Sequence, residues 1–285
     1  MKIPQRLQPL VEDGLVDEVI RQLMSGKEAT VYVVRCGSEI RCAKVYKEAA
    51  KRSYKKAVQY QEGRKVRNSR RARAMGKNSS FGRKQQEEIW QSAEVDALYK
   101  CAAADVRVPH PYGCFDGVLL MDLITDADGD VAPRLNDISM SEQQALNHHS
   151  QMMVYITKML CAGIVHGDLS EFNVLVDENG PVIIDMPQAV DASANNNAEA
   201  MFARDVNNMT NYYSQFAPQL AATKYAKEIW ALYEKGNLSP DTELTGLYTE
   251  DTRITDVDSI LDEIDAAYEE EQERLERISD AESID

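Results

Sequence analysis

The first half of the chain alternates short apolar runs with polar or glycine-containing breaks, a pattern typical of strands. Two runs at 30–34 and 40–46 are rich in β-branched and aromatic residues and flank a short polar turn, so they predict a hairpin. A third apolar run at 118–124 predicts another strand. Apolar residues within 16–23 recur at three- and four-residue intervals, so we expect a helix there.

The second half carries longer segments with helical periodicity. One predicted helix covers 85–104, a second covers 141–161 after a favourable N-cap, and further helices are expected within 199–235. Two short apolar runs flank the turn residues 178–181 and predict another hairpin. This order predicts the fold class α+β, with a two-lobed architecture: a β-rich N-terminal lobe, a helix-rich C-terminal lobe and a ligand cleft between them.

Charge is distributed unevenly along the 285 residues, whose net charge is −15. The stretch 44–84 holds 15 basic and 2 acidic residues, a net charge of +13, whereas 241–285 holds 3 basic and 17 acidic residues, a net charge of −14. A basic stretch in an acidic protein favours an anionic partner: nucleotide phosphates, RNA or the protein's own tail. A solvated helix or mobile loop without a partner is the other interpretation.

Composition also bears on cellular location. No run of about 18 apolar residues occurs, and no apolar stretch follows the N-terminus, so we expect neither a transmembrane helix nor a secretory signal. The five cysteines are odd in number and form no C-x-x-C pair. This usage indicates reduced thiols, a cytoplasmic location and no zinc site.

The most informative motif is the polar stretch His166 to Asn173, which is followed by an apolar strand and then by Asp185. Phosphoryl transfer requires a carboxylate that accepts the proton of the attacking hydroxyl, and oxygen ligands that hold Mg²⁺ on the phosphates. Asp168 fits the base, and Asn173 and Asp185 fit the metal ligands. An Asp- and Asn-rich turn is the alternative, but the ordered combination with H-G-D-L-x-x-x-N matches the kinase signature.

A lysine on an apolar strand adds to this pattern. Lys44 lies at the end of the run 40–46, as does the kinase lysine that pairs with the α- and β-phosphates. Its expected acidic partner on the following helix is Glu94, with Glu87 and Glu88 as alternatives. An edge-strand lysine that resists aggregation is the other interpretation of this residue alone.

The segment 25–32 is a candidate phosphate loop. It lacks the motif G-x-G-x-x-G, but Ser25 and Lys27 can contact phosphates, and Gly26 lets the backbone approach them closely. Taken alone, the segment is equally consistent with an ordinary turn.

Together these motifs resemble the RIO family of atypical serine/threonine protein kinases, in the branch with the phosphate loop S-T-G-K-E-A and the catalytic loop H-G-D-L-S-E-[FY]-N. The resemblance extends from about Val11 to Tyr233. The segments that carry it are Gly26 to Ala29, Ala43-Lys44, Arg107 to Pro109, Val118 to Met121, His166 to Asn173 and Ile184-Asp185.

The resemblance implies a trimmed, two-lobed kinase that binds ATP with Mg²⁺, or with Mn²⁺ in its place. It implies that Asp168, Asp185 and Lys44 are catalytic and that Asn173 and Asp185 bind the metal. The residues expected to contact ATP are Ser25, Gly26, Lys27, Glu28, Val31, Lys44, Glu94, Met121, Asp122, Ile124 and Ser170. In this set, Met121 backs the adenine pocket, and the Asp122 carbonyl and the Ile124 amide contact adenine.

In this family, the aspartate at the Asp185 position can itself accept phosphate. The resemblance therefore implies serine/threonine kinase activity, autophosphorylation and an ATPase-like cycle through an aspartyl-phosphate. The stretch 47–84 matches a mobile loop that carries an autophosphorylated serine in relatives. The candidates here are Ser53, Ser69, Ser79 and Ser80. Expected partners are ATP, a protein substrate or the protein itself, and RNA or a ribosomal particle through 44–84, but no membrane.

These motifs divide the chain into three expected parts. Residues 1–121 form an N-terminal lobe that includes the phosphate loop and the basic loop, 122–240 form the C-terminal catalytic lobe, and 241–285 form an acidic, partly helical tail. The chain departs from the family pattern at Met24-Ser25, where relatives have Ser-Thr. Ser170 stands where common kinases have a lysine, which leaves less positive charge near the γ-phosphate.

Two alternative functions remain. Small-molecule phosphotransferases of the aminoglycoside or choline kinase type share the motif H-G-D-L-x-x-x-N, but they carry a larger helical acceptor lobe than the chain after Asp185 allows. A nucleotide-switched RNA or ribosome assembly factor would instead use the basic stretch 44–84 for binding.

Overall fold

The computed structural model describes residues 3–26, 28–47 and 93–249. The chain divides into two units, Met1–Leu247 and Tyr248–Asp285, and all elements named below belong to the first. Most of the basic stretch at 44–84, and residues 250–285 of the predicted acidic tail, lie outside the described residues.

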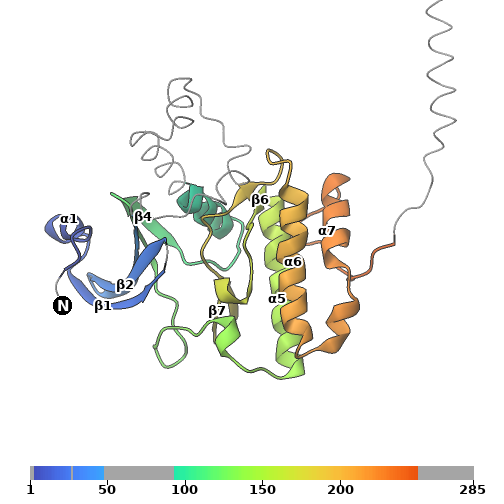
Figure 1. Cartoon of the computed structure of the whole chain (residues 1–285), viewed down its shortest axis with the longest axis horizontal. Helices are drawn as coiled ribbons and strands as arrows, with labels where there is room; N and C mark the ends of the chain where they lie inside the picture. The colour runs from blue at the N-terminus through green and yellow to red at the C-terminus, as the bar shows by residue number, and fades with distance from the viewer. Residues whose placement is uncertain (1–2, 27, 48–92, 250–285) are drawn as a thin grey trace, which may run out of the picture. The chain divides into compact units, whose positions relative to one another are not determined.

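The N-terminal part is built on a five-stranded antiparallel sheet (Figure 1). Its strands are β1 (Glu18–Ser25), β2 (Ala29–Cys36), β3 (Glu39–Tyr46), β4 (Pro111–Phe115) and β5 (Val118–Asp122), in the order β1-β2-β3-β5-β4. The short helix α1 (Gln8–Glu12) precedes them. Leu7 and Leu10 are buried with Val34 and Val118 in an apolar cluster, which attaches α1 to the sheet.

The predicted helix at 16–23 is wrong, because this segment enters β1, which pairs with β2. The pairing shifts register between Val19 and Arg21 and again between Gln22 and Met24. Each irregularity displaces the alternation of side chains, so the apolar residues lose the two-residue period of a strand and acquire spacings that resemble a helix. Pairing with β2 makes this segment a strand, and the spacing of residues within β1 does not reveal that pairing.

The other elements predicted in this part are largely confirmed. The runs at 30–34 and 40–46 lie in β2 and β3, and the run at 118–124 forms β5, which ends at Asp122. The helix predicted over 85–104 is described from residue 93 and is helical over 93–103. Strand β4 was not predicted, since proline and glycine within it weaken the strand pattern.

The C-terminal part packs three helices side by side: α5 (Glu142–Cys161), α6 (Ala198–Ser214) and α7 (Tyr225–Glu234) (Figure 1). They share the main hydrophobic core with the helix at 93–103. The short elements of this part are η3 (Leu135–Asp137), β6 (Ile164–Val165), η4 (Glu171–Asn173), β7 (Val174–Asp177), β8 (Gly180–Ile183), β9 (Val190–Asp191) and η5 (Pro218–Ala222). The predicted hairpin is β7 with β8, and β6 pairs with β9.

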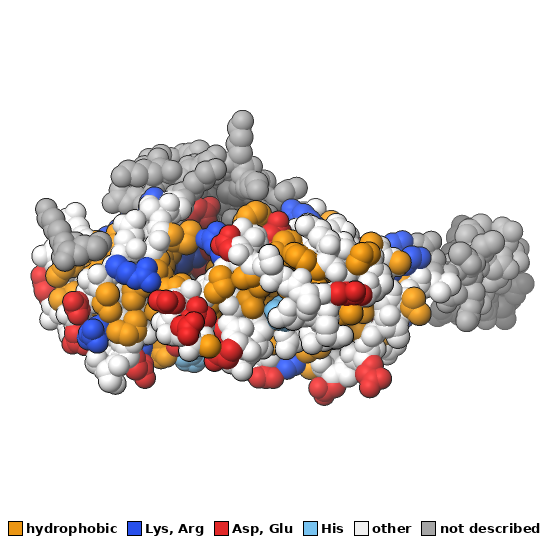
Figure 2. All heavy atoms as spheres, turned by 90° about the horizontal axis from the view of Figure 1, so that it is seen from below, with side chains coloured by type: hydrophobic (Ala, Val, Ile, Leu, Met, Phe, Trp, Pro, Cys, Tyr) orange, Lys and Arg blue, Asp and Glu red, His pale blue; other side chains and the backbone are white. Residues whose placement is uncertain are grey.

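The helices bury their apolar stripes in this core. In the described part of the chain, no helix is long and apolar enough to cross a bilayer. On the face shown in Figure 2, hydrophobic, basic and acidic side chains are intermixed.

The order of the elements along the chain confirms the sequence prediction of a β-rich part followed by a helix-rich part.

Helix α5 begins with a complete capping box. Ser141 Oγ accepts from Gln144 N at 3.3 Å, and Ser141 N donates to Gln144 Oε1 at 2.9 Å. We expect Ser141→Ala to lower the free energy of unfolding by about 1 kcal/mol, because it removes the acceptor of a helix N–H. Urea denaturation measures this difference. The exposed Ser139 provides a matched control, and a Ser141→Ala loss no larger than that of Ser139→Ala would contradict the capping role.

Candidate active site

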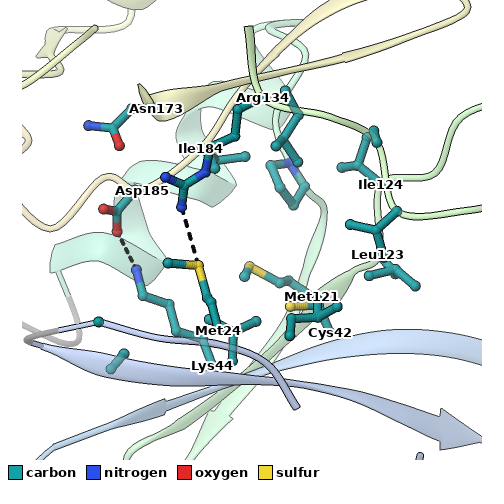
Figure 3. A pocket seen from close by; sticks show the side chains of 18 of the residues that line it. Met24, Cys42, Lys44, Met121, Leu123, Ile124, Arg134, Asn173, Ile184 and Asp185 are labelled. Atoms are coloured by element: carbon teal, nitrogen blue, oxygen red, sulfur yellow. Dashed lines mark hydrogen bonds and ion pairs between the residues drawn. The ribbon is translucent and has the colours of Figure 1, made fainter. Parts of the chain in front are cut away.

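A cavity of about 1090 Å³ lies between the sheet and the helical part (Figure 3). The predicted site residues that line it are Gly26, Glu28, Val31, Lys44, Met121, Asp122, Ile124, Asp168, Asn173 and Asp185. The predicted residues Ser25, Glu94 and Ser170 do not line it, and Lys27 lies outside the described residues. The fold thus gathers segments that are far apart in the sequence around one cavity.

Lys44 joins three segments of the chain, and Figure 3 shows its contact with Asp185. It lies on β3, which pairs on both sides, and its residue is only 7% exposed. Lys44 Nζ donates to Glu94 Oε1 at 2.6 Å and to Asp185 Oδ1 at 2.5 Å. Glu94 is the partner that the sequence favours, and the two alternative glutamates lie outside the described residues. Tyr46 OH donates to the second oxygen of Glu94 at 2.5 Å, so both carboxylate oxygens are hydrogen-bonded.

The charges of this group stabilise one another. Burial acts to lower the pKa of Lys44, but the attraction of Glu94 and Asp185 outweighs it, and the pKa lies above its ordinary value. Burial likewise acts to raise the pKa of Asp185, but the charge and hydrogen bond of Lys44, assisted by the charge of Arg134, bring the pKa below its ordinary value. Lys44 and Asp185 are therefore both charged at neutral pH.

Asp185 has an unusual backbone conformation. Its φ is 65°, in the left-handed region that costs a residue with a side chain about 1–2 kcal/mol. The preceding residue is fixed by a backbone bond from Ile184 N to Asn173 O at 3.0 Å, and the Asp185 carboxylate is held by Lys44. Surrounding contacts thus maintain a strained conformation at this position, as is common at functional sites.

The loop from His166 to Asn173 is held by its own polar groups. Asp168 N donates to His166 Nδ1 at 3.3 Å, and His166 Nε2 lies 3.1 Å from Ile184 O. A neutral imidazole with its proton on Nε2 satisfies both contacts, because the backbone N–H only donates and the carbonyl only accepts. Asn173 Nδ2 donates to Asp168 O at 2.8 Å, which leaves Asn173 Oδ1 without a partner among the described residues.

Asp205, on α6, holds the same loop from behind and was not predicted. Its carboxylate accepts from Gly167 N at 2.7 Å and from Leu169 N at 3.0 Å. Arg204 donates to Gly167 O, and Asn208 Nδ2 donates to Leu169 O at 2.9 Å. The sequence contains one signal for this role: Asp205 falls on the apolar stripe of its helix, where an aspartate requires polar partners.

The turn between β1 and β2 is held by Lys47, which the sequence analysis also missed. Lys47 Nζ donates to Gly26 O at 2.5 Å and to Ser25 Oγ at 3.1 Å, and Lys47 N donates to Glu28 O at 2.8 Å. Ser25 Oγ also lies 3.2 Å from Thr30 Oγ1. The Ser25 hydroxyl is therefore engaged within the turn, while Gly26 and Glu28 line the cavity.

The strand β5 leads into the linker that forms the opposite wall. The Asp122 carboxylate accepts from His110 N at 3.1 Å and from Tyr112 OH at 2.7 Å. Ile124 O accepts from Ala132 N at 3.0 Å, whereas the Ile124 N–H has no acceptor among the described residues. A backbone donor thus remains available at the apolar end of the cavity. Arg134 and Asp137, neither of them predicted, also line the cavity.

Asp205 provides a test by pH. Burial raises its pKa to about 6, although the two backbone N–H groups and the charge of Arg204 act in the opposite direction. Between pH values of about 4 and 6 the folded protein holds a proton that the unfolded chain releases, so this group's contribution to the free energy of unfolding falls as pH rises. Asp205→Asn cannot titrate. We expect wild-type stability relative to this variant to fall by about 2 kcal/mol between pH 4 and pH 7, measured by urea denaturation. A difference that is constant with pH would contradict this account.

Known proteins resemble this chain over the region that contains these segments. The sequence profile of the RIO domain matches residues 30–226. A RIO-type serine/threonine-protein kinase Rio1 of Haloferax volcanii is 31% identical over 205 residues, which is 72% of this chain and 66% of the relative. The human serine/threonine-protein kinase RIO1 is 29% identical over 180 residues, which is 62% of this chain and 30% of the relative. The chain thus spans less than two thirds of the length of each of these relatives.

Among solved structures, the Rio2 kinase–ADP/Mg²⁺–phosphoaspartate complex from Chaetomium thermophilum has a TM-score of 0.52. It is 18% identical, and the alignment covers 82% of this chain and 73% of that chain. This likeness shows a shared two-lobed kinase fold, which confirms the fold class predicted from the sequence. The profile match covers more than half of the chain. The chain therefore belongs to the RIO domain family.

Proposed function

We propose that the protein is a RIO-type serine/threonine protein kinase that uses ATP and Mg²⁺, autophosphorylates and also cycles as an ATPase through an aspartyl-phosphate. The observation that carries this proposal is the convergence on one cavity of Lys44, Asp168, Asn173 and Asp185, with Lys44 paired to Glu94. This is the set of groups that phosphoryl transfer from a nucleotide requires.

The cavity fits ATP at both of its ends. One end is lined by the apolar side chains of Val31, Met121 and Leu175, and it presents the Ile124 N–H as a donor for an adenine nitrogen. The other end presents Lys44, whose positive charge suits the phosphates. We assign the hinge contacts to Asp122 and Ile124 on this basis.

The residues present also fit Mg²⁺. Asn173 Oδ1 has no partner among the described residues, and the ionised Asp185 supplies carboxylate oxygens to the same cavity. Hard oxygen ligands in this small number, completed by phosphate and water, are what Mg²⁺ uses in nucleotide sites. When bound, the ion neutralises the charge that develops on the phosphates.

The chain's own groups then perform the transfer. Asp168 is exposed to the cavity and accepts the proton of the attacking hydroxyl, whose oxygen bonds to the γ-phosphorus as the bond to ADP breaks. In the second reaction, an Asp185 carboxylate oxygen attacks instead, and water then releases the phosphate. A Rio2 structure that contains phosphoaspartate supports this second route by analogy. Lys44, held by Glu94, orients the phosphates in both.

Incubation of the full chain with γ-labelled ATP and Mg²⁺ tests the proposal. We expect label on the protein and release of free phosphate, and a loss of about 100-fold or more for Asp168→Ala with ATP binding retained. Asp185→Asn should lose both products. The exposed Asp241, which does not line the cavity, gives the control Asp241→Asn, with wild-type rates expected.

The stability of the label separates the two routes. Acid-stable label indicates a phosphorylated serine or threonine, whereas label that hydroxylamine removes indicates an aspartyl-phosphate. An Asp168→Ala variant with wild-type turnover would exclude Asp168 as the base, and wild-type protein without label or phosphate release would refute the activity. The family assignment argues against the alternative small-molecule phosphotransferase.

The basic stretch 44–84 supports a further part of the proposal, an RNA or ribosomal partner. Its net charge of +13 favours a polyanion in an otherwise acidic protein. Reversing Arg70, Arg71 and Arg73 to glutamate should weaken binding of a single-stranded RNA oligonucleotide by about tenfold or more and reduce its salt dependence. Fluorescence anisotropy at several salt concentrations measures both. Absent or salt-independent binding by the wild type would exclude this partner.

A further inference from the structure

Arg134 projects into the cavity from the segment between β5 and α5 (Figure 3). Its backbone forms a β-bridge with Leu175 of β7, so the side chain originates in the helical part of the protein. Arg134 Nη2 donates to the thioether sulfur of Met24, on β1, at 3.3 Å. The Arg134 side chain therefore spans the cavity from one wall to the other.

This contact leaves most of the guanidinium unsatisfied. A guanidinium offers five N–H donors, and a thioether is a weak acceptor. Among the residues that the structure describes, Arg134 has no ion-pair partner, although its charge acts on the Asp185 carboxylate. A half-buried cation with unused donors inside a cavity favours an anionic ligand.

Arg134 lies between the two ends of the cavity. In Figure 3, Met121 and Ile124 lie at one end, Lys44 and Asp185 lie at the other, and Arg134 reaches between them. A nucleotide that extends from the first end to the second must pass the guanidinium. Phosphate oxygens are far stronger acceptors than the Met24 sulfur, so this side chain has a better partner once a nucleotide is present.

We infer that Arg134 is a phosphate-positioning residue, which exchanges its contact with Met24 for the phosphate oxygens of a bound nucleoside di- or triphosphate. The inference rests on the proposed function, because it assumes that the cavity binds ATP. Lys44 and Arg134 then hold the phosphates from opposite walls. This second cation offsets the serine at position 170, where common kinases have a lysine.

Nucleotide titrations test this role. Arg134→Met removes the charge and keeps an unbranched side chain. We expect it to raise the Kd for ATP and ADP by about 10- to 100-fold, and to leave binding of adenosine, which has no phosphate, unchanged. Arg134→Lys keeps the charge but not the fork of donors, so its Kd for ATP and ADP should lie between those of the wild type and Arg134→Met. Arg35→Met removes an arginine of β2 that pairs with Glu18 and should leave all three affinities unchanged.

Each outcome is decisive. Equal losses of ATP and adenosine binding in Arg134→Met would overturn the inference, because the side chain would then merely shape the cavity. An Arg134→Met variant that binds ATP as tightly as the wild type would also overturn the inference. The proposed function would then still stand, because the wild-type protein binds ATP. Wild-type protein that binds no ATP would overturn both. If Arg134→Met does not fold, Arg134→Lys carries the test, and wild-type affinity for ATP in that variant would overturn the assignment of the phosphate contact to the guanidinium of Arg134.

Discussion

The structure depends on one ion group, in which the buried Lys44 lies between the buried Glu94 and the more exposed Asp185. These residues belong to β3, to the helix at 93–103 and to the segment after β8, so a single ammonium joins the sheet, that helix and the edge of the cavity at Asp185. Breaking such a pair from one side leaves an uncompensated buried charge, which typically costs about 3–5 kcal/mol. The relative positions of the three segments are therefore coupled to the charge state of this group.

A second set of contacts fixes the loop that carries Asp168. From behind, Asp205 accepts two backbone N–H groups, and from within, Asn173 donates to the carbonyl of Asp168. Gly167 lies between these contacts with a φ of 81°, which a residue without a side chain adopts easily. The loop backbone is thus held by Asp205, which does not line the cavity, and by Asn173, which does, and the Asp168 carboxylate remains exposed to the cavity.

Two cations that line the cavity, Lys44 and Arg134, are held to different degrees. The strained Asp185 backbone and its ion pair with Lys44 hold the Asp185 carboxylate in place before any ligand binds. Among the described residues, Arg134 by contrast contacts only the weakly accepting sulfur of Met24, so we expect its position to respond to a ligand. Lys44 is thus held by contacts within the fold, whereas we expect Arg134 to be held by the ligand that the cavity binds.

The sequence alone determined the candidate chemistry, because Asp168, Asn173 and Asp185 stand in a motif whose residue types and spacing serve one reaction. It also determined most strands and helices, whose apolar periods are regular enough to recognise. Only the tertiary structure decided the strand β1, whose register shifts disguise its period, and the roles of Asp205 and Arg134. Their partners lie far away in the sequence, and local spacing carries no information about contacts that form when distant segments pack together.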